Sequence, residues 1–197
     1  MKHARKYVLA LVLAAAPVGG VFVASDACAS VSTAVAFDAL VSGAEAIAVV
    51  TPIEKKSVWE NGRIYTYTHV KTEQSVAGAL TSGSDGWVRT MGGVVDKIGQ
   101  LVEGEAVFTP GESSMVFLRK WKAGGTWEVT ARAQGQYPVV VDSTAKIRKI
   151  VHSARTGAVL PAKTAGNVRL AADVLHERTL DDAAHEVASA WQRLHPK

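Results

Sequence analysis

The chain has 197 residues, of which 48% are hydrophobic and 20% are charged, and its formal net charge at pH 7 is +4. This length and composition indicate one folded domain with enough apolar material for a core, and they exclude a largely disordered chain. Most of the 17 glycines lie between Gly78 and Gly135, which predicts a turn-rich β region there.

The first 29 residues have the features of a cleavable secretory signal peptide. Lys2, Arg5 and Lys6 form a basic segment, residues 7–16 form an apolar segment, and residues 27–29 supply a small-x-small cleavage pattern. An uncleaved membrane anchor is the alternative, but the apolar run is short for a membrane span. We therefore expect a signal peptide over 1–29 and a single exported domain over 30–197, located in the periplasm, on the cell surface or outside the cell.

Cys28 is the only cysteine, and it lies inside the expected cleavage region. A lipoprotein attached through Cys28 is an alternative location, although the residues before it lack the apolar side chain usual three positions upstream. Cleavage after Ala29 leaves a chain without disulfides, thiolate catalysis or cysteine-based metal sites. It also leaves a net charge of +2, which is no evidence for nucleic-acid binding.

The first elements of the expected domain are a short helix and a buried strand. Phe37, Leu40 and Val41 have the spacing of one helix face, which ends near Gly43. Residues 44–53 form a continuous apolar run that predicts a buried strand. Pro52, which cannot donate a backbone hydrogen bond, predicts a bulge or a strand edge.

Asn61-Gly62 is the strongest local signal in the chain, because both residues tolerate the positive φ of a two-residue type I′ turn. This turn pairs Glu60 with Arg63, and the register continues outward along both strands. One face then contains Trp59, Ile64, Thr66, Thr68 and Val70, and the other contains Val58, Tyr65, Tyr67, His69 and Lys71. Because the second face ends in charge, we expect the first to be core and the second to be partly solvated.

The rest of the chain reads as further strands and one terminal helix. Residues 78–86 are a loop, and 92–111 are an ordered excursion packed onto the barrel. Strands are expected over 87–91, 114–118, 126–131, 137–141 and 147–151, and 153–174 are expected to be irregular. Thr179 is an expected N-cap, with Asp182 completing a capping box, for an amphipathic helix over 179–195.

These elements predict a mainly β fold. We expect a small antiparallel barrel or sandwich, closest to an OB-like barrel, with the C-terminal helix packed outside. We expect no cofactor.

The motifs that suggest catalysis all have structural interpretations. The glycine-rich run lacks the GK[ST] ending of a phosphate loop, so Gly92-Gly93 more simply permits a tight turn or a close approach. The stretch around Ser113 lacks the second glycine of a nucleophile elbow. Glu103 and Glu105 are interpreted as a solvent-facing edge.

No motif brings the histidines of the expected domain together as metal ligands. They are His69, His152, His176, His185 and His195. A zinc site assembled from distant residues remains an open alternative, while solvated loop and helix histidines are the simpler interpretation.

Tyr65, Tyr67 and Trp121 are the candidate binding residues. Aromatic side chains on a partly solvated β face can stack on sugars or bases, or anchor a protein partner. Cross-strand packing under a loop is the structural alternative.

The order NGRIYTYTHVKTEQSVAG, GGVVDKIGQLVEGEAVFTPGESSMVFL and WEVTARAQGQYPV, over about 44–141, resembles a family of uncharacterised exported bacterial β-rich proteins. Ala106 departs from the proline that this family often has there. The resemblance implies a shared fold and carries no activity or ligand. The matching positions are Gly62, Arg63, Ile64, Tyr65, Thr66, Gly92, Gly93, Gly99, Val102, Gly104, Phe108, Gly111, Glu112, Phe117 and Leu118.

Two functional hypotheses follow from these observations. The first is a secreted or envelope-located, non-enzymatic domain that binds a protein or glycan partner outside the cytoplasm. The second is a hydrolase or metal-dependent enzyme whose site is assembled from separate strands, with histidines meeting carboxylates in one cleft. Nucleic-acid binding through an OB-like barrel is disfavoured by export and by the low net charge.

Overall fold

The computed structural model describes residues 31–161 and 168–196, and their elements are mostly strands. They are, in chain order, β1 (Ser32–Thr33), α1 (Phe37–Ser42), β2 (Ala46–Glu60), β3 (Arg63–Gly78), β4 (Asp85–Met91), β5 (Gly93–Val95), β6 (Ile98–Gln100), β7 (Ser114–Lys120), β8 (Trp127–Val129), a 3₁₀ turn (Arg132–Gly135), β9 (Gln136–Val141), β10 (Arg148–Ile150), β11 (Val159–Leu160), α2 (Ala171–Leu175) and α3 (Leu180–Leu194). No helix among these residues is long and apolar enough to cross a membrane.

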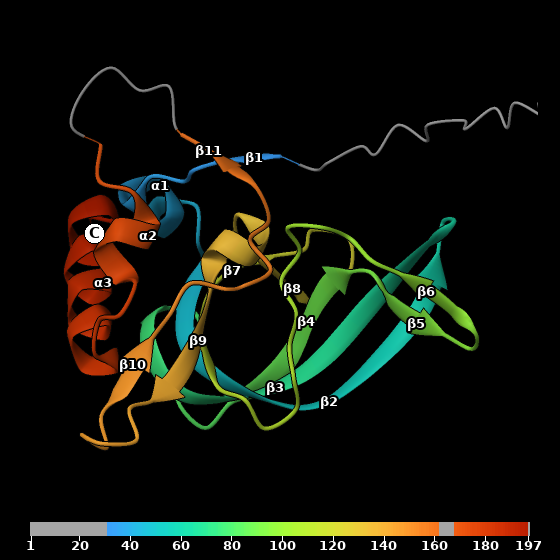
Figure 1. Cartoon of the computed structure of the whole chain (residues 1–197), viewed down its shortest axis with the longest axis horizontal. Helices are drawn as coiled ribbons and strands as arrows, with labels where there is room; N and C mark the ends of the chain where they lie inside the picture. The colour runs from blue at the N-terminus through green and yellow to red at the C-terminus, as the bar shows by residue number, and fades with distance from the viewer. Residues whose placement is uncertain (1–30, 162–167, 197) are drawn as a thin grey trace, which may run out of the picture.

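Five strands close into a barrel. The main sheet has the order β10-β9-β7-β2-β3-β4-β8, and the additional pairing of β7 with β8 closes β2, β3, β4, β8 and β7 on themselves (Figure 1). The β4–β8 pairing is parallel, and the other barrel pairings are antiparallel. The predicted mainly β, OB-like barrel is therefore confirmed, with β9 and β10 extending the sheet beyond it.

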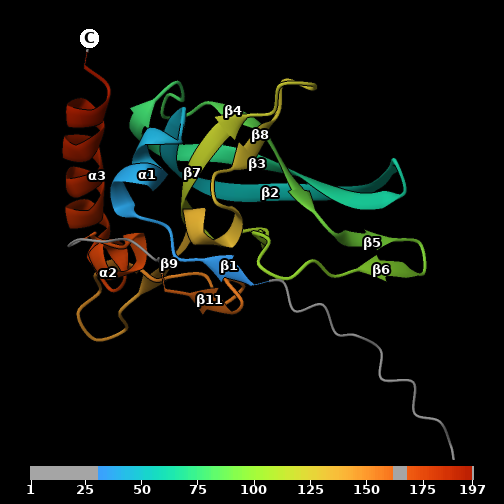
Figure 2. The same cartoon turned by 90° about the horizontal axis from the view of Figure 1, so that it is seen from above.

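The hairpin on Asn61-Gly62 has the predicted register. Asn61 and Gly62 both have positive φ, and Glu60 pairs with Arg63 at the turn. A register shift between Pro52 and Glu54 confirms the predicted bulge. Both strands are long and run past the barrel as a projecting arm, beside which β5 and β6 lie (Figures 1 and 2).

The expectation that Trp59 belongs to the core is wrong. Trp59 pairs with Ile64 as predicted, but 48% of its surface is exposed. Ile64, on the same face, is fully buried, because the excursion after β4 lies against it: the Gly92 N–H donates to the Ile64 carbonyl at 2.7 Å, and the Ile64 N–H donates to Gln100 Oε1 at 2.6 Å. Alternation of side chains identifies a face of a strand but does not show which residues of that face another segment covers.

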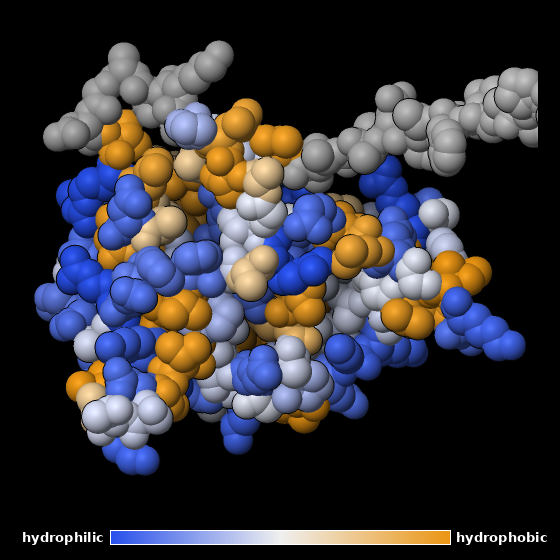
Figure 3. All heavy atoms as spheres, viewed as in Figure 1, coloured by the Kyte–Doolittle hydropathy of each residue, from blue (hydrophilic) through white to orange (hydrophobic). Residues whose placement is uncertain are grey.

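The glycine-rich run is an ordered excursion, as predicted, and it contains a hairpin that the sequence did not reveal. β5 and β6 pair with each other and form a separate two-stranded sheet. Apolar side chains cover the surface over these two strands (Figure 3), with Val94 and Ile98 exposed. The chain then returns to the barrel, where Ala106 and Phe108 are buried in its interior.

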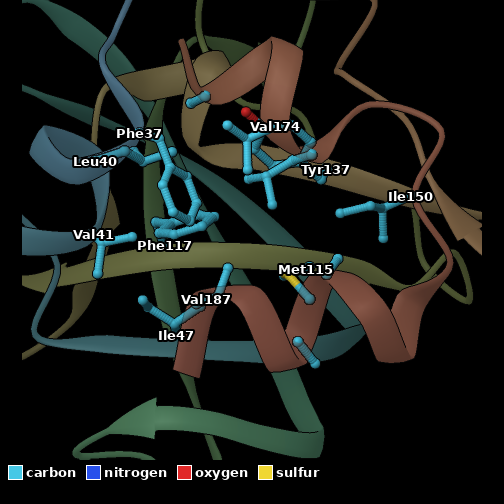
Figure 4. Packing of buried hydrophobic residues seen from close by; sticks show 14 of the residues in the cluster. Phe37, Leu40, Val41, Ile47, Met115, Phe117, Tyr137, Ile150, Val174 and Val187 are labelled. Atoms are coloured by element: carbon cyan, nitrogen blue, oxygen red, sulfur yellow. The ribbon is translucent and has the colours of Figure 1, made fainter. Parts of the chain in front are cut away.

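The apolar run of β2 is continuous because both faces of this strand are buried. Ala46, Ala48 and Val50 face the barrel interior, whereas Ile47 and Val49 face a second core beneath the helices. This second core lies between β2, β7, β9 and the three helices (Figure 4). Its labelled members are Phe37, Leu40, Val41, Ile47, Met115, Phe117, Tyr137, Ile150, Val174 and Val187.

The C-terminal helix packs outside the barrel, as predicted. Thr179 is the N-cap, and its hydroxyl accepts a hydrogen bond of 3.2 Å from the backbone N–H of Asp182. The helix runs over Leu180–Leu194, within one residue of the predicted ends at both sides. Its buried residues, including Val187, cover the second core, so α3 covers one side of the sheet (Figure 1).

Replacing Thr179 by alanine should destabilise the domain by about 1 kcal/mol, because it removes the side-chain cap of α3. Urea unfolding followed by circular dichroism measures this loss. Ser189→Ala is the control, since Ser189 is exposed in the middle of the same helix, and alanine there should be neutral or slightly stabilising. A Thr179→Ala variant as stable as the wild type would contradict a stabilising role of the cap.

The region expected to be irregular contains two short elements. β11 pairs in parallel with β1, and α2 covers part of the second core. A two-residue strand and a five-residue helix are too short to produce a periodic pattern. The expected signal peptide and Cys28 lie outside the described residues.

Candidate functional site

The three predicted binding residues lie close together on the outside of the barrel. Tyr65 and Tyr67 are on the outer face of β3, where Tyr67 is paired with Arg89 of β4. Trp121 follows β7, in the loop that leads to β8. The β3–β4 pairing and the closure of β7 onto β8 therefore bring residues far apart in sequence to one surface.

The guanidinium of Arg89 is the centre of this surface. Its Cζ lies 3.4 Å from the ring centroid of Tyr65 and 4.2 Å from that of Trp121. Its Nε donates to the Tyr67 hydroxyl at 3.2 Å. All three predicted residues thus contact one cation, by ring stacking or by a hydrogen bond. We call Tyr65, Tyr67, Arg89 and Trp121 the Arg89 surface.

Two carboxylates complete the hydrogen bonds of Arg89. Its Nη2 donates to Glu60 at 2.8 Å, and its Nη1 donates to Glu128 at 3.1 Å. Glu60 comes from the end of β2, and Glu128 is paired with Arg89 in the parallel β4–β8 ladder. The side chain of Arg89 is only 10% exposed. The contacts of Arg89 therefore link β4 to β2, β3 and β8 of the barrel.

Contacts within the cluster shift the pKa values of Glu60, Tyr67 and Arg89. Hydrogen bonds from the Tyr67 hydroxyl and from Arg89 lower the pKa of Glu60. Burial, followed by the hydrogen bond to Glu60, raises the pKa of Tyr67. Burial alone would lower the pKa of Arg89, but its hydrogen bonds to Glu60 and the tyrosines outweigh burial and raise it. The cluster therefore holds an ionised carboxylate, a neutral phenol and a fixed cation.

A charged cleft of about 240 Å³ borders the Arg89 surface. Tyr65, Arg89 and Glu128 line it together with Glu105 and Arg132. Glu105 Oε2 accepts from Arg132 Nε at 3.0 Å. Burial raises the pKa of Glu105, and the ion pair with Arg132 opposes this effect. The expectation that Glu105 lies on a solvent-facing edge is wrong, because it is 6% exposed.

The sequence predicted the aromatic members of the cluster and missed Arg89, Glu60 and Glu128. Arg89 carries a weak signal, since it alternates with the buried Val88 and Thr90 and must point outward. Its partners have no sequence signal. The register of β3 with β4 is set across a loop, residues 79–84, whose Ser82-Gly83 turn signal does not specify which residues pair, and Glu128 reaches Arg89 only through barrel closure.

The dispersed histidines form separate contacts. His69 Nε2 lies 2.9 Å from Asp85 Oδ2, and its ring stacks on Trp87. His152 and His176 meet, with their Nδ1 atoms 3.1 Å apart, and His152 also lines a pocket of about 490 Å³. The carboxylate beside them, Glu177, is exposed and lies 3.9 Å from His176 Nε2.

Within residues 31–161 and 168–196, no group of three or more His, Cys, Asp or Glu side chains is placed to hold a metal ion. Ser113, in the elbow-like stretch, donates to Glu73 Oε1 at 2.6 Å. The enzyme hypothesis thus has one histidine pair in its favour.

Comparison of the chain with protein-family models, with curated proteins and with solved structures finds no match in any of the three.

Proposed function

We propose that this chain is an exported, non-enzymatic domain that binds a protein partner through the Arg89 surface. The observation that carries the proposal is the convergence of Tyr65, Tyr67 and Trp121 on Arg89. Tyrosine, tryptophan and arginine are the residues that most often dominate the binding energy of protein interfaces. The signal-like first 29 residues support export.

The Arg89 surface is held in one arrangement before any partner arrives. Arg89 has three internal hydrogen-bond partners and two ring contacts, so little rotamer freedom remains to be lost on binding. The exposed Arg119, 3.5 Å from Glu128, lies next to this fixed cluster. A rigid aromatic centre beside accessible charges is the usual anatomy of a protein interface.

The same contacts favour a protein over a glycan or a nucleic acid. A sugar stacks on an open ring face, whereas the guanidinium of Arg89 covers one face of Tyr65. Phosphates are attracted by accessible cations, whereas the cation of Arg89 is paired with the carboxylates of Glu60 and Glu128.

The test uses Trp121→Ala, with Trp59→Ala as the matched control. Trp59 is an exposed tryptophan of the β2–β3 arm, on the face of that hairpin opposite to Tyr65 and Tyr67. Tagged chains are used to capture proteins from the extracellular and envelope fractions, and the affinity of each captured protein is then measured by calorimetry. We expect Trp121→Ala to weaken the specific partner about 30-fold or more. Trp59→Ala should bind normally.

Both variants must melt near the wild-type temperature for the comparison to apply. Equal capture of the same protein by wild type and Trp121→Ala would overturn the proposed surface. Binding to a glycan array that is lost only in Trp121→Ala would show a glycan ligand and overturn the proposed partner class.

A further inference from the structure

The mouth of the barrel contains a further cavity, of about 330 Å³, with two unlike walls. The wall formed by β2, β3 and β4 is polar and includes Thr68 and Thr90, both of which are buried. The opposite wall comes from the excursion after β4 and includes the apolar side chains of Val102 and Phe108. The mouth of a β-barrel is a common position for small-molecule sites.

Arg155 lines this cavity with a guanidinium that has unused donors. Its Nε and Nη2 atoms are buried and have no hydrogen-bond partner. The backbone of Arg155 is fixed in a turn, because its N–H donates to Ser153 Oγ at 3.2 Å and the Thr156 N–H donates to Ser153 O at 3.2 Å. A buried polar group without a partner is rare in folded proteins and indicates an ion, a water or a ligand.

The cavity has positive charge and no opposite charge. Lys55 and Arg155 are the charged residues that line it, and none of its described lining residues is an aspartate or glutamate. The carboxylate of Glu105 faces the neighbouring cleft, where it pairs with Arg132. An anion is the species that satisfies both the charge of Arg155 and its unused donors.

Some hydroxyls of the polar wall already donate hydrogen bonds within the fold, and others are left to donate to a ligand. Thr66 donates to the Gly92 carbonyl at 2.7 Å, so Ser57, 2.9 Å from Thr66 Oγ1, must donate to Thr66. These two hydroxyls are therefore committed to the fold. The side-chain donors left for a ligand include the fork of Arg155, the Thr68 hydroxyl and the amide nitrogen of Gln100, whose oxygen accepts from the Ile64 N–H, with the exposed Lys55 at the rim.

We propose that the barrel mouth binds a small organic carboxylate. The planar carboxylate fits the guanidinium fork of Arg155 and accepts from Thr68. The apolar wall of Val102 and Phe108 contacts the body of the ligand, and a cavity of this size admits a ring or a short branched chain. The site uses none of the residues of the Arg89 surface and does not depend on the proposed protein partner.

The experiment measures binding of benzoate, acetate and inorganic phosphate to the full chain by calorimetry and by thermal melting, in Tris buffer of low ionic strength. We expect benzoate to raise the melting temperature and to bind about tenfold or more tightly than acetate, because its ring contacts the apolar wall. Arg155→Met should weaken benzoate binding about 10- to 100-fold, the effect of losing hydrogen bonds to a charged donor. Its melting temperature without benzoate should equal or exceed that of the wild type.

Two control variants test whether the loss is specific to the cavity. Arg63→Met, which removes an exposed arginine outside the cavity, should bind benzoate normally. An equal loss in this variant would overturn the site in favour of non-specific attraction. If Arg155→Met does not fold, Thr68→Val decides, with an expected loss of about 3- to 10-fold.

Absence of benzoate binding to the wild type, or tighter binding of phosphate than of benzoate, would overturn the assignment to carboxylates. Trp121→Ala should bind benzoate like the wild type. This variant therefore distinguishes failure of the protein-partner proposal from failure of the carboxylate site.

Discussion

Replacing Arg89 by alanine should lower the free energy of unfolding by about 3 kcal/mol, because it leaves two carboxylates partly buried without their common cation. Glu60 and Glu128 are 26% and 24% exposed, so water replaces the lost guanidinium only in part. The substitution also removes the stacking on Tyr65 and Trp121. A domain of this kind has about 5–15 kcal/mol of stability, so the variant should fold with a reduced urea midpoint.

Arg119→Ala is the matched control for this prediction. Arg119 pairs with the same carboxylate, Glu128, but at 3.5 Å and with 57% of its side chain exposed. Such a pair contributes less than about 1 kcal/mol. Equal losses of unfolding free energy in the two variants would mean that the ion pairs of Arg89 contribute no more than the exposed pair of Arg119. A fully stable Arg89→Ala variant would mean that the fold does not need the cluster, which would leave partner binding as the reason for its presence.

The fold was predictable where local chemistry determines it. The turn at Asn61-Gly62 fixes the register from the Glu60–Arg63 pair to the Glu54–His69 pair, beyond which register shifts interrupt it. Thr179 and the spacing of apolar residues after it determine the start and the buried face of α3. Both signals lie within a few residues of the structure that they specify.

The centre of the candidate site was not predictable, because it is assembled by long-range pairing. Tyr65 and Tyr67 were recognised as a partly solvated face, but nothing near them in sequence indicates Arg89. The parallel β4–β8 pairing that brings Glu128 to Arg89 depends on the closure of the whole barrel. The alternation of apolar and polar residues shows on which face of a strand each side chain lies, but it does not show which strand is the neighbour.

Arg155 was missed for a different reason. It lies in the segment expected to be irregular, where no periodicity indicates whether a side chain points inward or outward. Its turn is fixed by the Ser153 hydroxyl, and its guanidinium meets a cavity whose other walls come from distant parts of the chain. A charged residue in a loop is most often solvated, so the burial of the Nε and Nη2 atoms of Arg155 is evident only from the structure.

Gly93→Ala should destabilise the domain by about 3 kcal/mol, which combines backbone strain with steric overlap. Gly93 has a φ of +135°, a conformation that residues with a Cβ rarely adopt. An added Cβ would lie 2.3 Å from Thr66 Oγ1 and 2.4 Å from Ser57 Oγ. These are the two hydroxyls bonded to each other at the barrel mouth, so the substitution should also disturb the start of β5. Urea unfolding measures the loss.

Gly111→Ala separates the two contributions to this loss. Gly111 also has a positive φ, of +84°, but an added Cβ there meets no heavy atom within 4 Å. This variant should lose only the strain contribution, about 1–2 kcal/mol. A larger loss in Gly93→Ala would show that glycine is needed for the close approach of the β5 hairpin to β2 and β3. Equal losses would mean that Ser57 and Thr66 rotate away from the new methyl group, so that positive φ alone accounts for the requirement for glycine at Gly93.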